Sequence, residues 1–356
     1  MDTTLKTLNA GALLRFQALQ AEAVRAVTER FYATHGSVYE QFGPRGREAC
    51  REDLAFHLEF LRPVLEFGLI QPMVDYLCWL NSVLVARSIP AKHLGQSLDW
   101  LAEFFAGHMD AAEGALVSAT LQAVRTKFLE IGESPAAPPV SPEHWPETAA
   151  FEAALLEGNQ REAMALVNRC IDDGHSLVEI ELHVIQAALY GIGEKWQANQ
   201  ASVAQEHMAT AIVQSIMTMA LLRSQPPASI GKRVLLACVE GNNHGVGLRM
   251  VADAFQLAGW EVQYLGANVP TRALIGQVAA WKPNLVGLSV SFAQQLRVVK
   301  EVIAQLGAQN GVARPGVIIG GLAINRFNSL AGVVGADAYC ADPRVALAYA
   351  RETLKG

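Results

Sequence analysis

The feature that most constrains the fold is a change of hydrophobic period at Lys232. From this point, short apolar runs rich in Val, Ile and Leu alternate with segments whose apolar residues repeat every three or four positions. The runs are RVLLACV, EVQYLGA, LVGLSVSF, GVIIGG and AYCA. Strands alternating with helices predict a parallel sheet covered on both faces, with ligands bound beyond the carboxyl ends of the strands. We therefore predict a Rossmann-like, doubly wound domain of about five strands over residues 232–356.

The chain before Lys232 is predicted to be helical and to divide at a proline-rich segment. Residues 132–147, GESPAAPPVSPEHWPE, hold too many prolines for a helix or a central strand and are predicted to be a linker. Residues 1–131 show helical periodicity almost throughout. Residues 148–225 contain four helical segments with short connections, which is typical of a four-helix bundle. The fold class is therefore α + α/β, with an N-terminal helical domain, a helical cap and the Rossmann-like domain.

Composition excludes several classes of protein. A hydrophobic content of 51% and a charged content of 17% are typical of a globular chain, and a net charge of −6 without a dense Lys/Arg block does not indicate a nucleic-acid surface. The five cysteines form no C-x-x-C pair, which suits reduced thiols in the cytosol. No apolar run approaches the roughly 20 residues of a membrane span. We expect a cytoplasmic protein that binds neither nucleic acid nor membrane.

A histidine lies where the first strand of the predicted sheet gives way to a loop. The stretch VEGNNHGVG contains N-x-H-x-x-G, formed by Asn242, His244 and Gly247. Taken alone, it is compatible with a glycine-rich turn in which the histidine is incidental. Small residues follow two later strands at the same edge of the sheet: Ser289, Ser291, Gly320 and Gly321. Because these loops converge, the small residues are expected to leave a slot there.

Together these motifs resemble the cobalamin (vitamin B12) binding Rossmann domain, in which a D-x-H-x-x-G loop is followed by S-x-L and GG. The resemblance covers residues 232–355. It implies that His244 replaces the dimethylbenzimidazole of the cofactor as the lower cobalt ligand. It also implies that the displaced nucleotide tail enters the slot lined by Ser289, Ser291, Gly320 and Gly321.

Two positions depart from the motif of that family. Asn242 stands where the family has an acid, and Ser291 replaces a leucine. A carboxylate that accepts the imidazole N–H makes the other ring nitrogen more basic, whereas a neutral amide can orient the ring but polarises it less. Glu240 is close enough in sequence to be a substitute partner.

A second motif lies in the predicted bundle, in EKWQANQASVAQEHMAT. Ser202, with Gln205 three residues later, predicts an N-cap and capping box. Glu206 and His207 then fall in the first turns of that helix, and Trp196 ends the preceding one. Judged alone, a tryptophan at this position is most often a core residue, and the Glu–His pair is most often solvated.

Ahead of a B12 domain, the W-x9-E-H spacing resembles the cap of the B12-dependent photoreceptor family. The resemblance implies that Trp196 covers the upper adenosyl group of adenosylcobalamin, that Glu206 helps to hold it, and that His207 is able to take the upper cobalt position after light. It further implies a homo-oligomer with light-dependent assembly and a downstream protein partner. The sequence shows no Ser–His–Asp set, no metal-ligand cluster and no P-loop, so no catalytic motif indicates an enzyme. A corrinoid methyl carrier of a methyltransferase system and a cobalamin storage protein stay open as alternatives.

Repressors of that family carry a basic winged-helix module before the cap, and this N-terminal region does not contain one. Its ring-bearing residues are compatible with packing or dimerisation. Its position before a light-sensing module resembles the photocobilins, which pair cobalamin with a linear tetrapyrrole such as biliverdin. That resemblance implies a bilin site in which Arg62, Arg87 and Lys92 meet the propionates. The ring-bearing residues that would line the pyrrole rings are Phe31, Tyr32, Tyr39, Phe42, His57, Phe60, Tyr76, Trp79, Trp100, Phe104 and Phe105.

Overall fold

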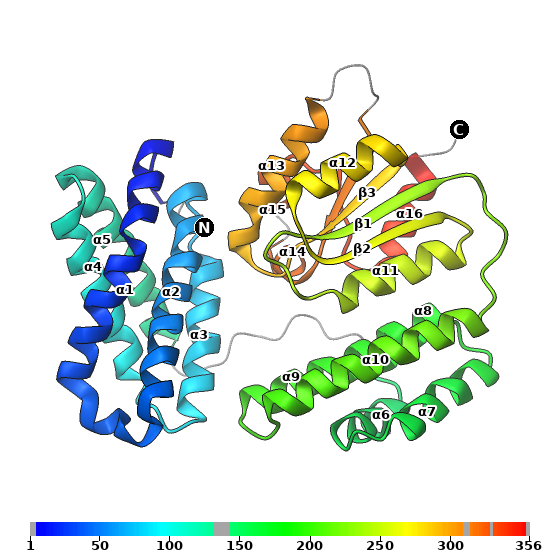
Figure 1. Ribbon diagram of the computed structural model, residues 1–356, viewed down its shortest axis with the longest axis horizontal. Coiled ribbons are helices and arrows are strands. Elements are labelled where there is room, and N and C mark those ends of the chain that lie inside the picture. Colours follow the sequence, from blue (N-terminus) through cyan, green and yellow to red (C-terminus); the bar gives the residue numbers. More distant parts are fainter. Residues whose placement is uncertain (1–4, 132–142, 309–313, 328–329, 354–356) are drawn as a thin grey trace. The chain divides into compact units, whose positions relative to one another are not determined.

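The computed structural model describes residues 5–131, 143–308, 314–327 and 330–353 (Figure 1). The chain divides into two compact units, Met1–Ala137 and Pro138–Gly356. Most of the predicted linker lies outside the described residues, and its last five residues are described at the start of the second unit.

The first unit is a bundle of helices, as the sequence predicted. Its elements are α1 (Ala10–Tyr39), the short turn η1 (Glu40–Phe42), α2 (Gly43–Phe67), α3 (Gln71–Val85), α4 (Lys92–His108) and α5 (Ala111–Ile131). Helix α1 begins at Asn9, whose side-chain oxygen accepts a hydrogen bond from the backbone N–H of Ala12 at 2.9 Å. Helix α2 ends at Gly68, whose φ of 74° permits the left-handed cap. Phe16 and Phe105 pack together in the core, with ring centroids 4.8 Å apart.

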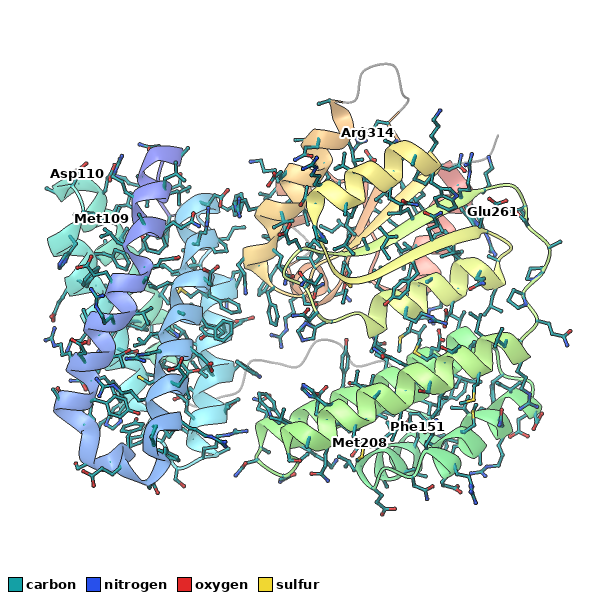
Figure 2. All side chains as sticks on the ribbon, viewed as in Figure 1. Met109, Asp110, Phe151, Met208, Glu261 and Arg314 are labelled. Carbon is teal, nitrogen blue, oxygen red and sulfur yellow. The ribbon has the colours of Figure 1, made fainter. Side chains whose placement is uncertain are left out.

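The second unit begins with the predicted four-helix bundle. Its helices are α6 (Glu147–Leu156), α7 (Gln160–Asp172), a rod made of α8 (Leu177–Ile180), η2 (Glu181–Gln186) and α9 (Ala187–Gln197), and α10 (Val203–Arg223). Phe151 of α6, labelled in Figure 2, is fully buried in the core of this bundle. Ser202 and Gln205 form the predicted capping box at the start of α10, which is therefore confirmed. The rod contains an unpredicted feature, because η2 is a π-helical turn.

The predicted parallel sheet of five strands is confirmed. Its strands are β1 (Arg233–Val239), β2 (Glu261–Val269), β3 (Leu285–Ser289), β4 (Gly316–Gly320) and β5 (Ala338–Tyr339), in the order β2-β1-β3-β4-β5. The covering helices are α11 (Val246–Leu257), α12 (Thr271–Trp281), α13 (Leu296–Gly307), α14 (Leu322–Arg326), α15 (Leu330–Val334) and α16 (Pro343–Thr353). Helices α11 and α16 pack together on one face of the sheet, and α12 packs on α13 on the other (Figure 1). The order in which the strands are added to the sheet reverses between β1 and β3, so ligands are expected at the carboxyl ends of these two strands.

Candidate functional site

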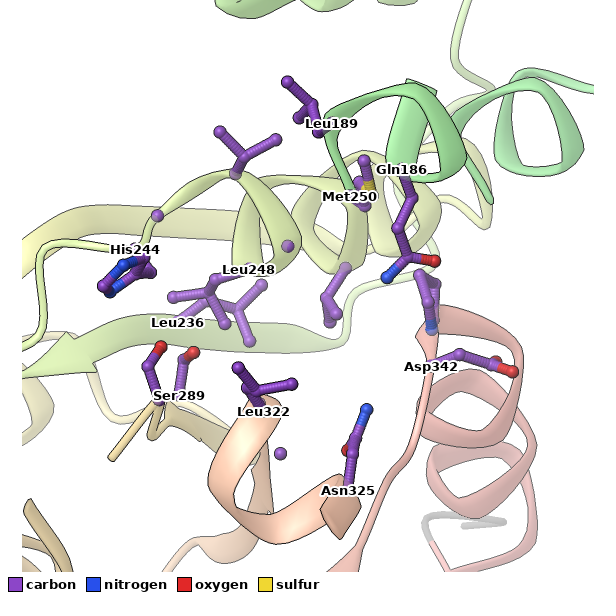
Figure 3. A pocket seen from close by; sticks show the side chains of 18 of the residues that line it. Gln186, Leu189, Leu236, His244, Leu248, Met250, Ser289, Leu322, Asn325 and Asp342 are labelled. Carbon is purple, nitrogen blue, oxygen red and sulfur yellow. The ribbon is translucent and has the colours of Figure 1, made fainter. Parts of the chain in front are cut away.

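A cavity of about 670 Å³ lies within the second unit, where the carboxyl edge of the sheet meets the bundle. We call it the sheet cavity. Its walls come from η2, α9 and α10 of the bundle, from the loop after β1 with the start of α11, and from the ends of β3 and β4 (Figure 3). The bundle and the sheet therefore enclose one space at the edge where the strand order predicts a ligand.

His244 lines this cavity, in the loop between β1 and α11 (Figure 3). Its ring meets the ring of Phe292 edge to face, with centroids 5.2 Å apart. Burial lowers the pKa of His244, and the negative charge of Glu206 raises it by a smaller amount. A neutral imidazole is the form that binds a metal ion, so lowering the pKa favours the ligating form at neutral pH.

Asn242 does not contact the imidazole of His244 through the hydrogen bond that a carboxylate would make in the family motif. Its side chain is fully buried, donates to the backbone carbonyl of Ser289 at 2.9 Å and accepts from the backbone N–H of His244 at 3.1 Å. Glu240, the substitute considered from sequence, accepts from the backbone N–H of Thr271 at 3.3 Å. Among the hydrogen bonds of the described residues, none joins either side chain to the ring. Asn242 therefore joins the histidine loop to the end of β3 and makes no hydrogen bond to the imidazole ring.

The glycines of the motif serve different purposes. A Cβ at Gly320 would lie 2.7 Å from the carbonyl oxygen of Cys340, and one at Gly321, whose φ is 101°, would lie 2.5 Å from that of Val290. These two glycines are required by close packing of the protein backbone itself. Gly247 lines the cavity, and a Cβ there would have no protein atom within 4 Å. Gly247 thus leaves open space on the cavity wall, which fits a bulky ligand seated there.

The two serines lie in the lower part of the same cavity. Ser289 and Ser291 are both buried and line it (Figure 3). The backbone N–H of Ser291 donates to Gln295 Oε1 at 3.0 Å, and Gln295 Nε2 donates to the carbonyl of Gly241 at 2.9 Å. Gln295, which the sequence motifs did not indicate, therefore joins the end of β3 to the histidine loop.

The bundle contributes the upper wall, including two of the three predicted cap residues. Glu206 and His207 of α10 line the cavity, and Glu206 Oε2 accepts from His207 Nδ1 at 2.6 Å. Because a carboxylate only accepts, the proton of this hydrogen bond is on Nδ1 of His207, and in a neutral ring Nε2 is the nitrogen with the lone pair. Thr210 donates from Oγ1 to Glu206 Oε1 at 3.1 Å.

Trp196 is half-buried near the end of α9 and is not among the described residues that line the cavity. Four residues of the same rod that the sequence motifs did not indicate line the cavity: Leu182, Gln186, Leu189 and Tyr190. Their spacing of four, three and one along one rod is a helical-face pattern. That pattern alone does not distinguish a cavity wall from a packed core.

The first unit contains a second cavity of about 440 Å³, which we call the helical cavity. Of the three predicted cations, Arg87 lines it, whereas Arg62 and Lys92 do not. Arg62 instead donates to Gln17 Oε1 at 3.1 Å. Of the eleven predicted ring residues, four line it: Phe31, Tyr39, Phe42 and His57. Arg45, Cys50, Asp53 and His93 were not predicted and line it as well.

Two buried titratable groups mark the wall of the helical cavity. Burial raises the pKa of Asp53 to about 6. Burial lowers the pKa of His57 to about 3, and its Nδ1 lies 3.0 Å from the hydroxyl of Tyr76. The cavity therefore combines a neutral histidine and a carboxyl group whose pKa is about 6 with the cations Arg45 and Arg87.

Two domain families match the second unit. Residues 232–348 match a B12 binding domain, and residues 148–220 match a second B12 binding domain family. No helix in the described ranges is both long enough and apolar enough to cross a membrane.

Individual relatives point the same way. The HTH-type transcriptional repressor CarA of Myxococcus xanthus is 29% identical over 210 residues, which cover 59% of this chain and 67% of the relative. The dimethylamine corrinoid protein 3 of Methanosarcina mazei is 31% identical over 116 residues, covering 33% and 68%. The solved monomethylamine corrinoid protein of Methanosarcina barkeri superimposes with a TM-score of 0.51 at 18% identity, covering 58% of this chain and 97% of that one, and shows the shared fold.

This chain spans about half to two thirds of the length of most of the curated relatives it matches. Both domain families that match it bear the description of B12 binding, and together they span the two walls of the sheet cavity. The chain belongs to the family of cobalamin-binding proteins.

Proposed function

We propose that the chain is a light-sensing protein that binds adenosylcobalamin in the sheet cavity and signals to a protein partner through a change of conformation or assembly. The observation that carries the proposal is one cavity with a histidine on each wall: His244 from the sheet edge and His207 from α10. The similarity to two HTH-type transcriptional repressors, CarA and CarH, supports a regulatory rather than a catalytic role. We place its action in the cytoplasm.

In this proposal the residues of the two walls have separate tasks. The cofactor supplies absorption of visible light and a cobalt–carbon bond that light breaks. His244 would be the residue that binds cobalt, and Gly247 leaves open space on the cavity wall beside it. The proposed slot for the nucleotide tail is lined by Ser289, Ser291, Gly320 and Gly321. The side chain of Asn242 holds Ser289 in place through a hydrogen bond to its backbone carbonyl.

On the upper wall, Glu206 holds the Nδ1 proton of His207. In a neutral ring, Nε2 of His207 would then be the atom available to bind cobalt. Trp196 is proposed to cover the adenosyl group, which requires the end of α9 to move toward the cavity.

The test uses the full chain loaded with adenosylcobalamin in the dark. Absorption spectra and size-exclusion profiles are recorded before and after green light. We expect a spectral change and a change of assembly in the wild type, and an altered illuminated spectrum in His207→Ala. Trp196→Ala should weaken dark binding of adenosylcobalamin more than that of hydroxocobalamin. An illuminated wild type with unaltered spectrum and elution would refute light sensing.

A second candidate is a corrinoid methyl carrier, favoured by similarity to dimethylamine corrinoid proteins and by the fold shared with the monomethylamine protein. It predicts transfer of the methyl group of bound methylcobalamin to a partner methyltransferase, with Trp196→Ala having little effect. The expectation that nucleic acid is not a partner has no support from the relatives, because two are named as HTH-type repressors. A gel-shift assay in the dark and in light decides that point.

We also propose that the helical cavity binds biliverdin or another linear tetrapyrrole. Arg45 and Arg87 provide cations for propionates, and Phe31, Tyr39 and Phe42 provide ring surfaces. A visible band that shifts to the red on titration of the chain with biliverdin is the expected result. Arg87→Gln should weaken this binding, and the matched variant Arg62→Gln should not, since Arg62 lies away from the cavity. Equal effects of both variants would contradict this site.

A further inference from the structure

Two carboxyl side chains are buried together where the bundle meets the Rossmann-like domain. Glu181 begins the π turn η2, and Asp253 lies on α11. Their exposed fractions are 0% and 1%. Asp253 Oδ1 accepts from Arg249 Nε at 2.6 Å, whereas both oxygens of Glu181 and Oδ2 of Asp253 have no N–H or hydroxyl partner among the described residues. Two ionised carboxylates in such a place would be strongly unfavourable.

The two groups can satisfy each other only if one of them carries a proton. Burial raises the pKa of Glu181 well above its ordinary value, the charge of Asp253 raises it further, and Arg249 lowers it. Burial also raises the pKa of Asp253, and its contacts with Arg249 oppose that rise. Because Arg249 pairs with Asp253, Glu181 is the carboxyl that more readily keeps a proton, and once protonated it is able to donate to Asp253.

Among the described residues, no charged side chain of the other elements packed on η2 shifts the pKa of Glu181. Helices α6, α8 and α9 also pack on η2. Their charged residues are Glu147, Glu152, Glu179, Glu194 and Lys195. None of these, nor His183 of η2 itself, contributes to the pKa shift of Glu181 among the described residues. The charge balance at the contact is therefore decided by Glu181, Asp253 and Arg249.

Both elements that carry this pair also line the sheet cavity. Helix α11 starts two residues after His244 and contributes Leu248 and Met250, and η2 contributes Leu182 and Gln186 (Figure 3). The π turn thus presents one residue to α11 and others to the cavity. Moving η2 away from α11 would open a wall of the cavity and admit water to both carboxyl groups.

We propose that Glu181 and Asp253 form a proton-linked latch, which holds the bundle against the Rossmann-like domain while one proton is shared and releases it when that proton is lost. Separation exposes Glu181 to water, where its carboxyl ionises and the proton passes to solvent. The latch belongs to the chain without cofactor, so it does not rest on light sensing.

The sign of the pH dependence follows from the raised pKa of Glu181. A carboxyl that holds its proton more tightly in the closed state stabilises that state fully below its ordinary pKa, and this stabilisation is lost as pH rises toward the raised value. One proton released on opening raises the opening equilibrium by up to about tenfold per pH unit in this range. Opening should therefore increase from pH 6 to pH 9.

The test is hydrogen–deuterium exchange of the cofactor-free full chain between pH 6 and pH 9, corrected for the intrinsic exchange rate. Peptides covering η2 and α11 should lose protection as pH rises in the wild type. Glu181→Gln, a neutral mimic of the protonated acid, should flatten this dependence and be better protected at pH 9. Glu194→Gln is the matched control, since Glu194 is exposed on α9, and it should keep the wild-type slope.

A second variant keeps the result clear if Glu181→Gln folds poorly. Asp253→Asn should reduce the slope, because the charge of Asp253 no longer adds to the effect of burial on the pKa of Glu181. Its folding is checked by circular dichroism before exchange. A wild-type slope retained in both variants, or a wild type without a slope, would overturn the latch.

Discussion

The two cavities of this chain are built by different means. The motif residues of the sheet cavity lie in loops and at strand ends, where the backbone of His244 and Ser289 is hydrogen-bonded to Asn242 and Gly321 lies against the backbone of Val290, while Glu206 and His207 come from the start of α10. The helical cavity is lined mainly by side chains of helices, of the turn η1 and of the connection after α3. Its ring residues pair side chain to side chain, as in Tyr39–His93 and His57–Tyr76, whereas Arg87 and Ser97 donate to carbonyls of their own helical turns.

This difference decides how tolerant each cavity is to substitution. A loop at a strand end needs particular residues at particular backbone angles, so its sequence is constrained and forms a motif. A cavity between helices needs side chains of suitable volume on one face, and many sequences provide that. We therefore expect the largest effects of mutation at the sheet cavity.

The strongest expected effect is on cobalamin binding in His244→Ala. Even outer partners of metal ligands typically contribute 10–100-fold to affinity, so loss of His244, the proposed cobalt ligand, should weaken binding by more than about 100-fold. A spectroscopic titration with hydroxocobalamin measures this. The exposed His144 offers a matched control, and His144→Ala should bind as the wild type does. Comparable binding by His244→Ala would break the contrast between the two cavities.

The next effect separates two glycines of the sheet cavity. Gly321→Ala places a Cβ against the carbonyl of Val290 at a φ of 101° and should lower the free energy of unfolding by about 1–3 kcal/mol. Gly247→Ala meets no protein atom and should leave stability nearly unchanged while weakening cobalamin binding. Chemical denaturation and the cobalamin titration test the two halves. If Gly321→Ala is as stable as the wild type, the backbone packing inferred here is wrong.

A third prediction concerns the buried amide of Asn242. In Asn242→Asp the carboxylate could not donate to the carbonyl of Ser289 and would be buried beside it, so we expect a loss of about 1–3 kcal/mol of stability. The denaturation midpoint at pH 7 measures the loss. Asn199→Asp, at an exposed position, is the control. Unchanged stability would mean that the amide does not hold the loop.

The smallest effect near neutral pH is expected in the helical cavity, where the change develops only in acid. The pKa of His57 is lowered to about 3 by burial, so the folded unit resists protonation there. A group with a lowered pKa stabilises the fold above its ordinary value near 6.5, and this is lost as pH falls toward 3, by up to about tenfold per pH unit. Hydrogen exchange of α2 and α3 should therefore rise in acid, and less so in His57→Gln. The sign is opposite to that of Glu181. An acid dependence unaltered in His57→Gln would assign it to another group.

Much of the fold could be predicted, because the hydrophobic period reports it directly. The five apolar runs correspond to five strands, and Ser202 with Gln205 marked the start of α10. The π turn η2 was missed because it leaves the apolar pattern of the rod nearly unchanged. The helical cavity was only partly predicted. Arg62 and Lys92 are cations like Arg87, but they do not line the helical cavity. The periodicity of the sequence does not distinguish these three residues.

The sequence by itself determined the helical and α/β regions, the edge of the sheet that carries the site, and His244 with its glycines. Local period, turn chemistry and strand order depend on neighbouring residues, so these features can be recognised along the chain. Only the tertiary structure decided that Asn242 binds backbone rather than the imidazole, and that Trp196 lies outside the cavity wall. It also decided that Glu181 and Asp253, distant in sequence, share one buried contact. Direction and burial of a side chain depend on what packs against it, and that is specified by no single segment.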